Sequence, residues 1–495
     1  MQSWDNIINT AMLGTDKKMP DNRDMPEELA GAFALIQSNE VADKEEKFLQ
    51  SAALLYNYKQ CGLMPVKKET VTLTAALPET KPWCSNFSTQ VLKDIFFEES
   101  IPLLLFWLKH CQAAGQLVKP ELLPAVLAAG ADNKKLQPYI AACTGNRGEW
   151  LGNFNEVWNF SKQQSAAEQW HTGTPEQRKA VLKETRITDP VVANEWLQQS
   201  WTQEDAASKL AFLEILSDTI NSEDIPFLEK LSTEKSKKLK EVALSLLKCI
   251  PGSPVVVQYQ QLLKETVVLK KEKALLGLSS KTVLQWQLPA AIPGETFKTG
   301  IEKLSSTKDL SDEHFIIYQL MQHVPPPFWE QQLDGSPGQI IELFQTDTTG
   351  KKMLFALLTA IKNFKDKEWA LAMMQHSEVF YADLLPLLSP AQQEYYSNRF
   401  FEQHAENIIQ YAVQRQDEWG HELAKNILGY TAKNTYQYPR SFYNQHIHLL
   451  PQTAGQELEK FSPTETYMQN MWSNTSEYIV KLLHIKSQII QSFNQ

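Results

Sequence analysis

Apolar residues recur at helical spacing in the stretch from Ile225 to Ser253. The last part of the stretch carries apolar side chains at intervals of three or one residue, which trace one face of a helix with 3.6 residues per turn. These positions are Leu239, Val242, Ala243, Leu246, Leu247 and Ile250. Pro251-Gly252 ends the helix. Because a helix with a single apolar face must bury it against a neighbour, the pattern predicts an array of stacked helices.

Signals for the start of a helix precede this segment at short intervals. Thr174-Pro175-Glu176-Gln177 has the form of a capping box with proline at the first helical position. Asp189-Pro190 repeats the signal, and Thr202 is the expected N-cap of the next helix. We therefore expect helices to begin near residues 175, 190, 203 and 222 or 237, and we interpret 166–290 as a HEAT-like repeat array.

The rest of the chain also has mainly helical periodicity, so the predicted fold class is all-α, a HEAT-like α-solenoid with additional helical regions at both ends. No sheet is expected, although alternating apolar residues from Val71 to Leu77 would allow a short extended segment. The predicted division is an N-terminal helical region (1–62), a linker (63–82), a helical region (83–165), the array (166–290), a looser connector with one helix at Glu313–His323 (291–338), and a C-terminal helical region (339–495) whose last helix is Ser476–Phe493.

The amino-acid composition indicates the broad class of protein to which the chain belongs. The hydrophobic share of 43% and the charged share of 21% are typical of a globular soluble protein. The best apolar run, Ile101–Leu108, is far shorter than the roughly 20 residues that span a bilayer. The N-terminus lacks the pattern of a signal peptide, and the five cysteines are widely spaced and odd in number. We expect reduced, buried thiols and a cytoplasmic protein without a membrane segment.

One segment is locally basic, although the chain has a net charge of −10. Residues 229–273 contain ten lysines and five glutamates, with Lys235, Lys237, Lys238 and Lys240 around the start of the strongest helix. One interpretation is a solvated loop and helix face. The other is a docking patch for an acidic partner or for nucleic acid, and the overall negative charge disfavours nucleic acid.

A second candidate lies at Gly145-Asn146-Arg147-Gly148-Glu149-Trp150. In a structural interpretation, Gly145 ends a helix, Gly148 makes a turn, and Arg147 pairs with a carboxylate or with free helix carbonyls. In a functional interpretation, the glycines form a backbone nest in which Arg147 binds an anion or a partner's carboxylate. The residues leave both open.

Motifs for metal or enzyme chemistry are incomplete. His421-Glu422-Leu423-Ala424-Lys425 has lysine where a zinc helix needs its second histidine. His446-Ile447-His448 would place two rings on one side of an extended segment, without acidic or cysteine residues nearby. Asp347–Lys352 lacks the first glycine and the hydroxyl residue of a phosphate loop. We expect no catalytic set, metal or cofactor.

Several longer stretches carry a family resemblance. Residues 103–130 and 145–158, with the Gly-x-Arg-Gly-x-Trp core, are followed by Ile250-Pro251-Gly252-Ser253, by 324–333 and by 367–374. In this order they resemble an uncharacterised bacterial family of HEAT-like helical proteins, similar to α-solenoid adaptors. At 234–242 a lysine-rich sequence replaces the more arginine-rich pattern of that family.

The resemblance implies a scaffold, because genes of the family commonly lie beside those of a MoxR-type AAA+ ATPase, a von Willebrand A-domain protein and a SWIM zinc-finger protein. It supplies no catalytic residues. The first hypothesis is therefore a non-catalytic adaptor for protein partners, with the AAA+ ATPase or the von Willebrand protein as candidates. The alternative is a HEAT-like nucleic-acid-binding protein of the DNA-repair type that uses the 229–273 lysines.

Overall fold

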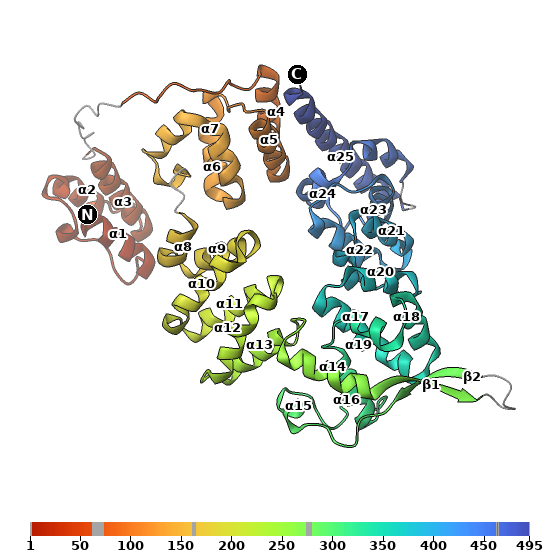
Figure 1. The fold of residues 1–495 in the computed structure, drawn as a ribbon. Coiled ribbons are helices and arrows are strands. Elements are labelled where there is room, and N and C mark those ends of the chain that lie inside the picture. The colour runs from red at the N-terminus through yellow and green to blue at the C-terminus, as the bar shows by residue number, and fades with distance from the viewer. Residues whose placement is uncertain are drawn as a thin grey trace. The chain divides into compact units, whose positions relative to one another are not determined.

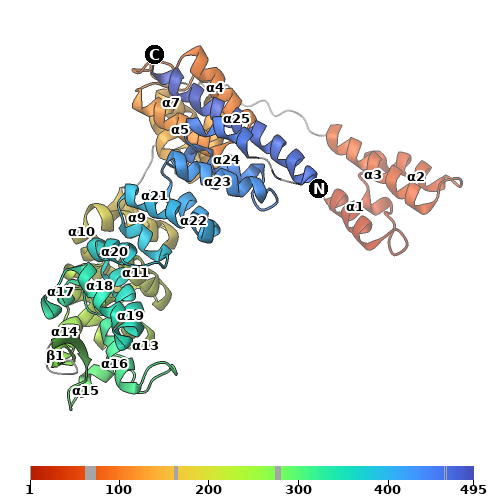
Figure 2. The ribbon, with the colours of Figure 1, turned by 90° about the vertical axis from the view of Figure 1, so that its right-hand side faces the viewer.

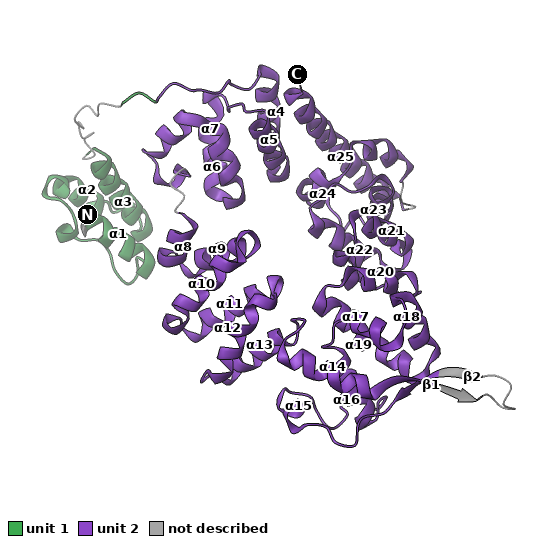
Figure 3. Ribbon diagram, in the orientation of Figure 1, with its two compact units in different colours: residues 1–76 green, residues 77–495 purple. Residues whose placement is uncertain are grey.

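The computed structural model describes residues 2–61, 74–160, 165–273, 280–461, 463 and 465–494. Helices account for 73% of the structure and strands for 2%, so the all-α class is confirmed. The chain forms two compact units, Met1–Ala76 and Leu77–Gln495 (Figure 3). The finer division into six segments stays a prediction, and much of the expected linker, including Val71 and Leu73, lies outside the described residues.

The first unit is built from α1 (Gln2–Leu13), α2 (Ala30–Ser38) and α3 (Lys44–Cys61). Its small core consists of Ile7, Met25, Phe33 and Leu55. Phe33 is the most deeply buried of these, with 1% of its surface exposed.

The second unit begins with the helices that the sequence placed in the 83–165 region and in the array (Figure 1). They are α4 (Asn86–Phe97), α5 (Ile101–Ala113), α6 (Leu123–Asp132), α7 (Gln137–Gly152), α8 (Ala166–Thr172), α9 (Pro175–Thr188), α10 (Pro190–Ser200), α11 (Ala206–Thr219), α12 (Ile225–Lys230), α13 (Lys237–Leu247) and α14 (Pro254–Thr266). Three 3₁₀ turns lie between helices α10 and α13: η6 (Trp201–Gln203), η7 (Ser222–Asp224) and η8 (Leu231–Thr233).

A hairpin and a second run of helices follow. The strands are β1 (Val267–Lys273) and β2 (Ser280–Trp286). The helices are α15 (Gly294–Lys298), α16 (Asp312–Met321), α17 (Pro327–Leu333), α18 (Pro337–Thr346), α19 (Thr348–Phe364), α20 (Lys367–Gln375), α21 (Pro390–Arg399), α22 (Phe401–Arg415), α23 (His421–Lys433), α24 (Arg440–His446) and α25 (Thr466–Phe493), with 3₁₀ segments η9 (Ala382–Leu387), η10 (Ile447–Leu449) and η11 (Gln452–Lys460).

Helices α8 to α13 share a core of their own, and α9 packs against α8, α10 and α11 while α13 packs against α11 and α12. The apolar face predicted for α13 is confirmed, because Leu239, Ala243, Leu246 and the following Ile250 are buried in this core. Burial of that face supplies the stability that α13, with its lysine-rich start, lacks as an isolated helix.

Most of the predicted helix starts in this region are confirmed. Thr174 closes a capping box with Gln177, and the Asp189 side chain accepts from the backbone N–H of Val192. Thr202 is wrong as an N-cap. It lies inside η6, and Asp205 caps α11 instead by accepting from Ser208 N at 2.8 Å. Because the 3₁₀ turn η6 takes up Trp201–Gln203, α11 begins only at Ala206. Asp205, and not Thr202, therefore stands directly before the helix and caps it.

The expectation of no sheet is wrong. β1 and β2 form an antiparallel hairpin in which Val267 pairs with Trp286 and Leu269 with Leu284 (Figure 1). β-Branched Val267 and Val268 follow α14 directly and favour the extended backbone. The hairpin is held to the unit by Trp286, whose ring lies 5.4 Å from that of Phe344.

Two further helical boundaries differ from expectation. The connector 291–338, expected to hold one helix, contains α15, α16 and α17. α17 begins at Pro327, a residue that suits the first turn of a helix although a run of prolines suggests a loop. The last helix, α25, begins at Thr466, ten residues before the predicted start at Ser476.

The first and last helices of the second unit lie side by side. α25 packs against α4 and α5, as the two views in Figures 1 and 2 also show. The rings of Trp107 and Phe493 are 5.2 Å apart, and Lys481 pairs with Glu98 at 2.5 Å. One apolar core therefore includes α4 to α7 together with α14 to α25.

Candidate partner-binding surface

The Gly145–Trp150 motif lies inside α7 and breaks it. Gly145 has φ 57° and ψ −159°, a conformation open to glycine, while the residues on both sides remain helical. The predicted end of a helix at Gly145 is therefore a kink. Gly148 does not make a turn, because it is buried within the helical part that follows.

The kink forms a backbone nest for a carboxylate. Asn146 N donates to Glu79 Oε2 at 2.9 Å, and Arg147 N donates to Glu79 Oε1 at 2.8 Å. The Asn146 side chain donates to Pro78 O at 2.7 Å. A Cβ on Gly145 would collide with Glu79 Oε2, so glycine is required both for the backbone angle and for the space.

The structural and the functional interpretation of Arg147 are therefore each partly correct. A nest exists, but it is filled by a carboxylate of the same unit, and Arg147 contributes its backbone N–H to it. The Arg147 guanidinium is exposed and lies 5.5 Å from the centre of the Trp83 ring, a cation–π distance. The motif therefore holds the segment before α4 against α7.

The predicted lysines lie together around the turn between α12 and α13. Lys235, Lys237, Lys238 and Lys240 are all exposed. Lys237 approaches Glu241 at 3.7 Å, with the two side chains 91% and 62% exposed, a geometry that contributes little to stability. In the part of the chain that the structure describes, Lys235, Lys238 and Lys240 form no ion pair. Arg147, on α7, is not part of this cluster.

The lysines occupy the wrong end of α13 for helix stability. Ser236 caps the helix and Lys237, Lys238 and Lys240 follow in or next to its first turn, which contains no acidic residue. The N-terminus of a helix carries a partial positive charge, so each cation there is unfavourable by about 0.3–1 kcal/mol. The local energetics of α13 do not account for this arrangement, and the positive end of the helix adds to the field of the lysines.

The lysine cluster adjoins a cleft of about 720 Å³ between η6, α11, α12 and η8. Trp201, Phe227 and Leu231 supply its apolar lining, and Lys209, Lys230 and Lys235 supply its positive charges. Gln198, Thr202, Thr233 and Glu234 complete the lining. The sequence indicated Lys235 but not Lys209 and Trp201, because these residues come together only when α11 and α12 both pack against α13.

Glu234, the acidic residue of the cleft, is already engaged. Trp201 Nε1 donates to Glu234 Oε1 at 2.7 Å, and Lys209 Nζ reaches the same oxygen at 3.3 Å while lying 5.3 Å from the Trp201 ring centre. These contacts, the Trp201 bond first, lower the pKa of Glu234. Lys230 and Lys235 remain exposed at the cleft, and both are available to an incoming anion.

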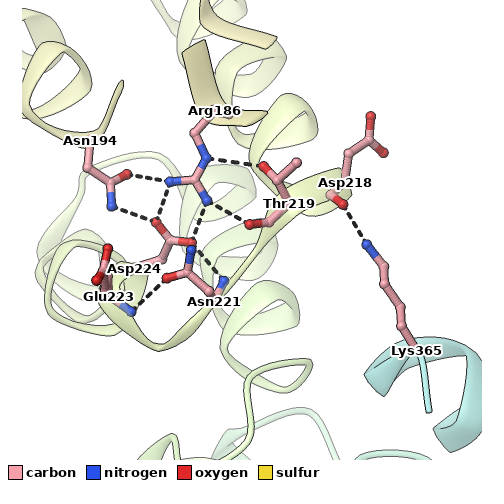
Figure 4. Close-up of polar contacts among 8 residues, drawn as sticks. All are labelled: Arg186, Asn194, Asp218, Thr219, Asn221, Glu223, Asp224 and Lys365. Carbon is pink, nitrogen blue, oxygen red and sulfur yellow. Dashed lines mark hydrogen bonds and ion pairs between the residues drawn. The ribbon is translucent and has the colours of Figure 1, made fainter. Parts of the chain in front are cut away.

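A buried polar network joins α9, α10 and the end of α11 to η7 (Figure 4). Arg186 on α9 forms a two-bond ion pair with Asp224 of η7, at 2.8 and 3.0 Å, and both side chains are fully buried. Asn194 of α10 bridges the pair, and the guanidinium also donates to Thr219 Oγ1 and Thr219 O at the end of α11. Each nitrogen of the Arg186 guanidinium donates to a partner, so this charge is compensated.

The network reaches a distant part of the same unit. Lys365, at the end of α19, donates to Asp218 O, next to Thr219, at 2.5 Å (Figure 4). Lys365 itself has φ 52°, a left-handed backbone that ends α19. Helices α8 to α13 are therefore connected by a hydrogen bond to the helices of the other core.

The incomplete motifs have structural explanations. Asp347 caps α19 by accepting from Gly350 N at 2.6 Å and also accepts from Trp286 Nε1. The expected extended His446–His448 segment is wrong, because α24 ends at His446 and a 3₁₀ turn follows. Burial lowers the pKa of His448 to about 4, so its ring is neutral near pH 7. In the described ranges, no group of three or more histidine, cysteine, aspartate or glutamate residues is placed to hold a metal.

The cysteines only partly follow expectation. Cys84, Cys111 and Cys143 are buried, Cys249 is half-buried and Cys61 is exposed. The neighbouring Cys143 thiol and burial both raise the pKa of the Cys111 thiol, so it stays protonated. Among the helices described, none is both long and apolar enough to cross a bilayer.

Comparison with known proteins places the chain in a family. No match was found among curated proteins or among solved structures. Residues 6–493 match the model of DUF5691, a family of unknown function, and the chain belongs to that family.

Proposed function

We propose that the chain is a non-catalytic helical scaffold of the cytoplasm. In this proposal α8 to α13 form a HEAT-like array, and the array docks an acidic segment of a protein partner in the basic cleft. The cleft of about 720 Å³ combines an apolar lining with three lysines, and its carboxylate is already bonded to Trp201. An acidic peptide with an apolar anchor residue matches both features.

The arrangement of lysines at the start of α13 is the observation that carries this proposal. Cations in the first turn cost stability, yet Lys237, Lys238 and Lys240 stand there and are exposed to solvent. A charge pattern that opposes the fold is typical of a functional surface. The buried Arg186–Asp224 pair supports the same conclusion, since it fixes η7 and hence the start of α12 beside the cleft.

The family resemblance suggests candidate partners, the MoxR-type AAA+ ATPase and the von Willebrand A-domain protein. The test uses the purified chain, immobilised, with each of these two proteins and a short DNA duplex as analytes. Saturable binding of one protein, with weak and salt-sensitive binding of DNA, supports the scaffold. Tight binding of the duplex without binding of either protein would instead support the alternative, a nucleic-acid-binding protein.

A further inference from the structure

A second groove lies between α22, α23 and η11, on elements that the proposed function does not use. Its volume is about 490 Å³, within the roughly 300–1,000 Å³ usual for small-molecule sites. Phe401, Tyr430 and Phe461 line it with aromatic rings from three different segments. The rings of Phe401 and Tyr430 meet edge to face, with centres 6.3 Å apart.

Two contacts fix these rings in place. Tyr430 OH donates to Glu406 Oε1 at 3.2 Å, which fixes the orientation of the phenol. Gly429 lies in the middle of α23, where glycine costs a helix about 1 kcal/mol relative to alanine. A Cβ on Gly429 would lie 3.2 Å from Phe461 Cε1, so glycine allows the Phe461 ring to approach the helix closely.

Lysines outnumber carboxylates among the residues that line the groove. Lys425, Lys433 and Lys460 line it, against one carboxylate, Glu402. Lys425 and Lys460 have acidic neighbours three residues earlier, Glu422 at 3.8 Å and Glu457 at 2.9 Å. Lys433 is exposed and has no ion pair within the described part of the chain. Its ammonium is thus free for an anionic ligand.

We propose that this groove binds a nucleoside phosphate. The base lies against the rings of Phe401, Tyr430 and Phe461, and the phosphate is held by Lys433 with Lys425 and Lys460 at the rim. Asn426 also lines the groove. Its Nδ2 donates to Asn398 Oδ1 at 3.0 Å, which leaves its own carbonyl oxygen to accept from an amino group of a base.

Calorimetric titration of the full chain tests this site with ADP, GDP and UDP, and with adenosine and pyrophosphate as half-ligands. At least one nucleotide is expected to bind at a single site, at least tenfold more tightly than adenosine or pyrophosphate, because the rings and the lysines each contribute. Lys433→Glu should weaken that nucleotide at least tenfold. Lys135→Glu, an exposed lysine that belongs to neither basic site, is the matched control and should leave the affinity unchanged.

Three results would contradict the proposal that this groove binds a nucleoside phosphate. They are the absence of saturable binding for all three nucleotides, pyrophosphate binding as tight as nucleotide binding, and equal affinity of the Lys433→Glu variant and the native chain. Phe461→Leu separates stacking from charge, and it should weaken nucleotide binding without changing the weak binding of pyrophosphate. None of these outcomes depends on the protein-docking cleft, so failure here leaves the scaffold proposal standing and the reverse also holds.

Discussion

At the residue scale, Leu246 and Lys238 show that one helix has both a buried face and an exposed face. Both lie on α13, with Leu246 7% exposed in the core that α8 to α13 share and Lys238 exposed to solvent. Leu246→Ala should destabilise the protein by about 2–5 kcal/mol, since it leaves a cavity. Lys238→Ala, which removes a cation from the positive end of α13, should leave stability unchanged or raise it by up to about 1 kcal/mol. Urea titration of both variants checks this, and equal losses would show that the buried face of α13 is wrong.

Two half-buried histidines predict how stability depends on pH. Burial lowers the pKa of both His323 and His448 to about 4, from an ordinary value of 6.5. The unfolded chain therefore binds more protons between these values, and stability falls as the pH drops from about 6.5 to 4. His448→Gln should make the urea midpoint less dependent on pH in this window than it is in the native protein. An unchanged dependence would show that His448 does not titrate in the unfolding transition.

Single residues could be interpreted from sequence where their partners are local. The Thr174 capping box involves a residue three positions away, and its geometry is as expected. Arg147 shows the limit, because its motif indicates a nest but the carboxylate that fills it comes from Glu79, 68 residues earlier. Only folding brings Glu79 to Gly145, and no spacing along the chain indicates that approach.

At the scale of elements, the helical periodicity was sufficient to predict the helices and the buried face of α13 and insufficient to predict the hairpin. The stripe from Leu239 to Ile250 repeats often enough to define a face, and that face is buried. β1 and β2 span seven residues each but show no regular alternation of apolar and polar positions, since β1 begins with three consecutive apolar residues and ends with four charged ones. The segment also follows α14 without a turn signal, so local sequence alone does not mark where the helix ends.

The nest at the α7 kink predicts a specific loss on substitution. Glu79→Gln keeps the size of the side chain but replaces one accepting oxygen by an N–H₂ group that cannot accept. The amides of Asn146 and Arg147 should then exchange with deuterium about tenfold faster, which corresponds to a local loss of about 1.4 kcal/mol. Glu156→Gln, an exposed glutamate of the same region, is the control. Unchanged exchange at both amides would show that Glu79 does not hold the kink.

At the scale of the whole molecule, two observations on the second unit could not come from the sequence. Helices α4 and α25, at opposite ends of the unit, pack together, and Lys365 contacts the end of α11 from a distant part of the chain. The basic cleft likewise depends on tertiary structure, because Lys209 and Lys235 meet at it from separate elements. The lysine cluster itself was visible in the sequence, since its four members lie within six residues.

The central claim is that the basic cleft docks an acidic protein partner, and the rate of association at increasing salt tests it most directly. The variant is Lys235→Glu with Lys238→Glu, two exposed lysines without ion pairs in the described part of the chain, and the control is Lys134→Glu with Lys135→Glu, an exposed pair beside α7. The protein partner should bind the variant at least about tenfold more slowly and with little dependence on salt, while the control matches the native chain.

The stability of the double variant to urea provides a second test of the claim. Because Lys238→Glu puts a negative charge at the positive end of α13, the double variant should unfold at an equal or higher urea concentration than the native protein while its binding is lost. That combination of slower association and undiminished stability is the result that the account predicts. Association of the variant at the native rate and with the native salt dependence would contradict it.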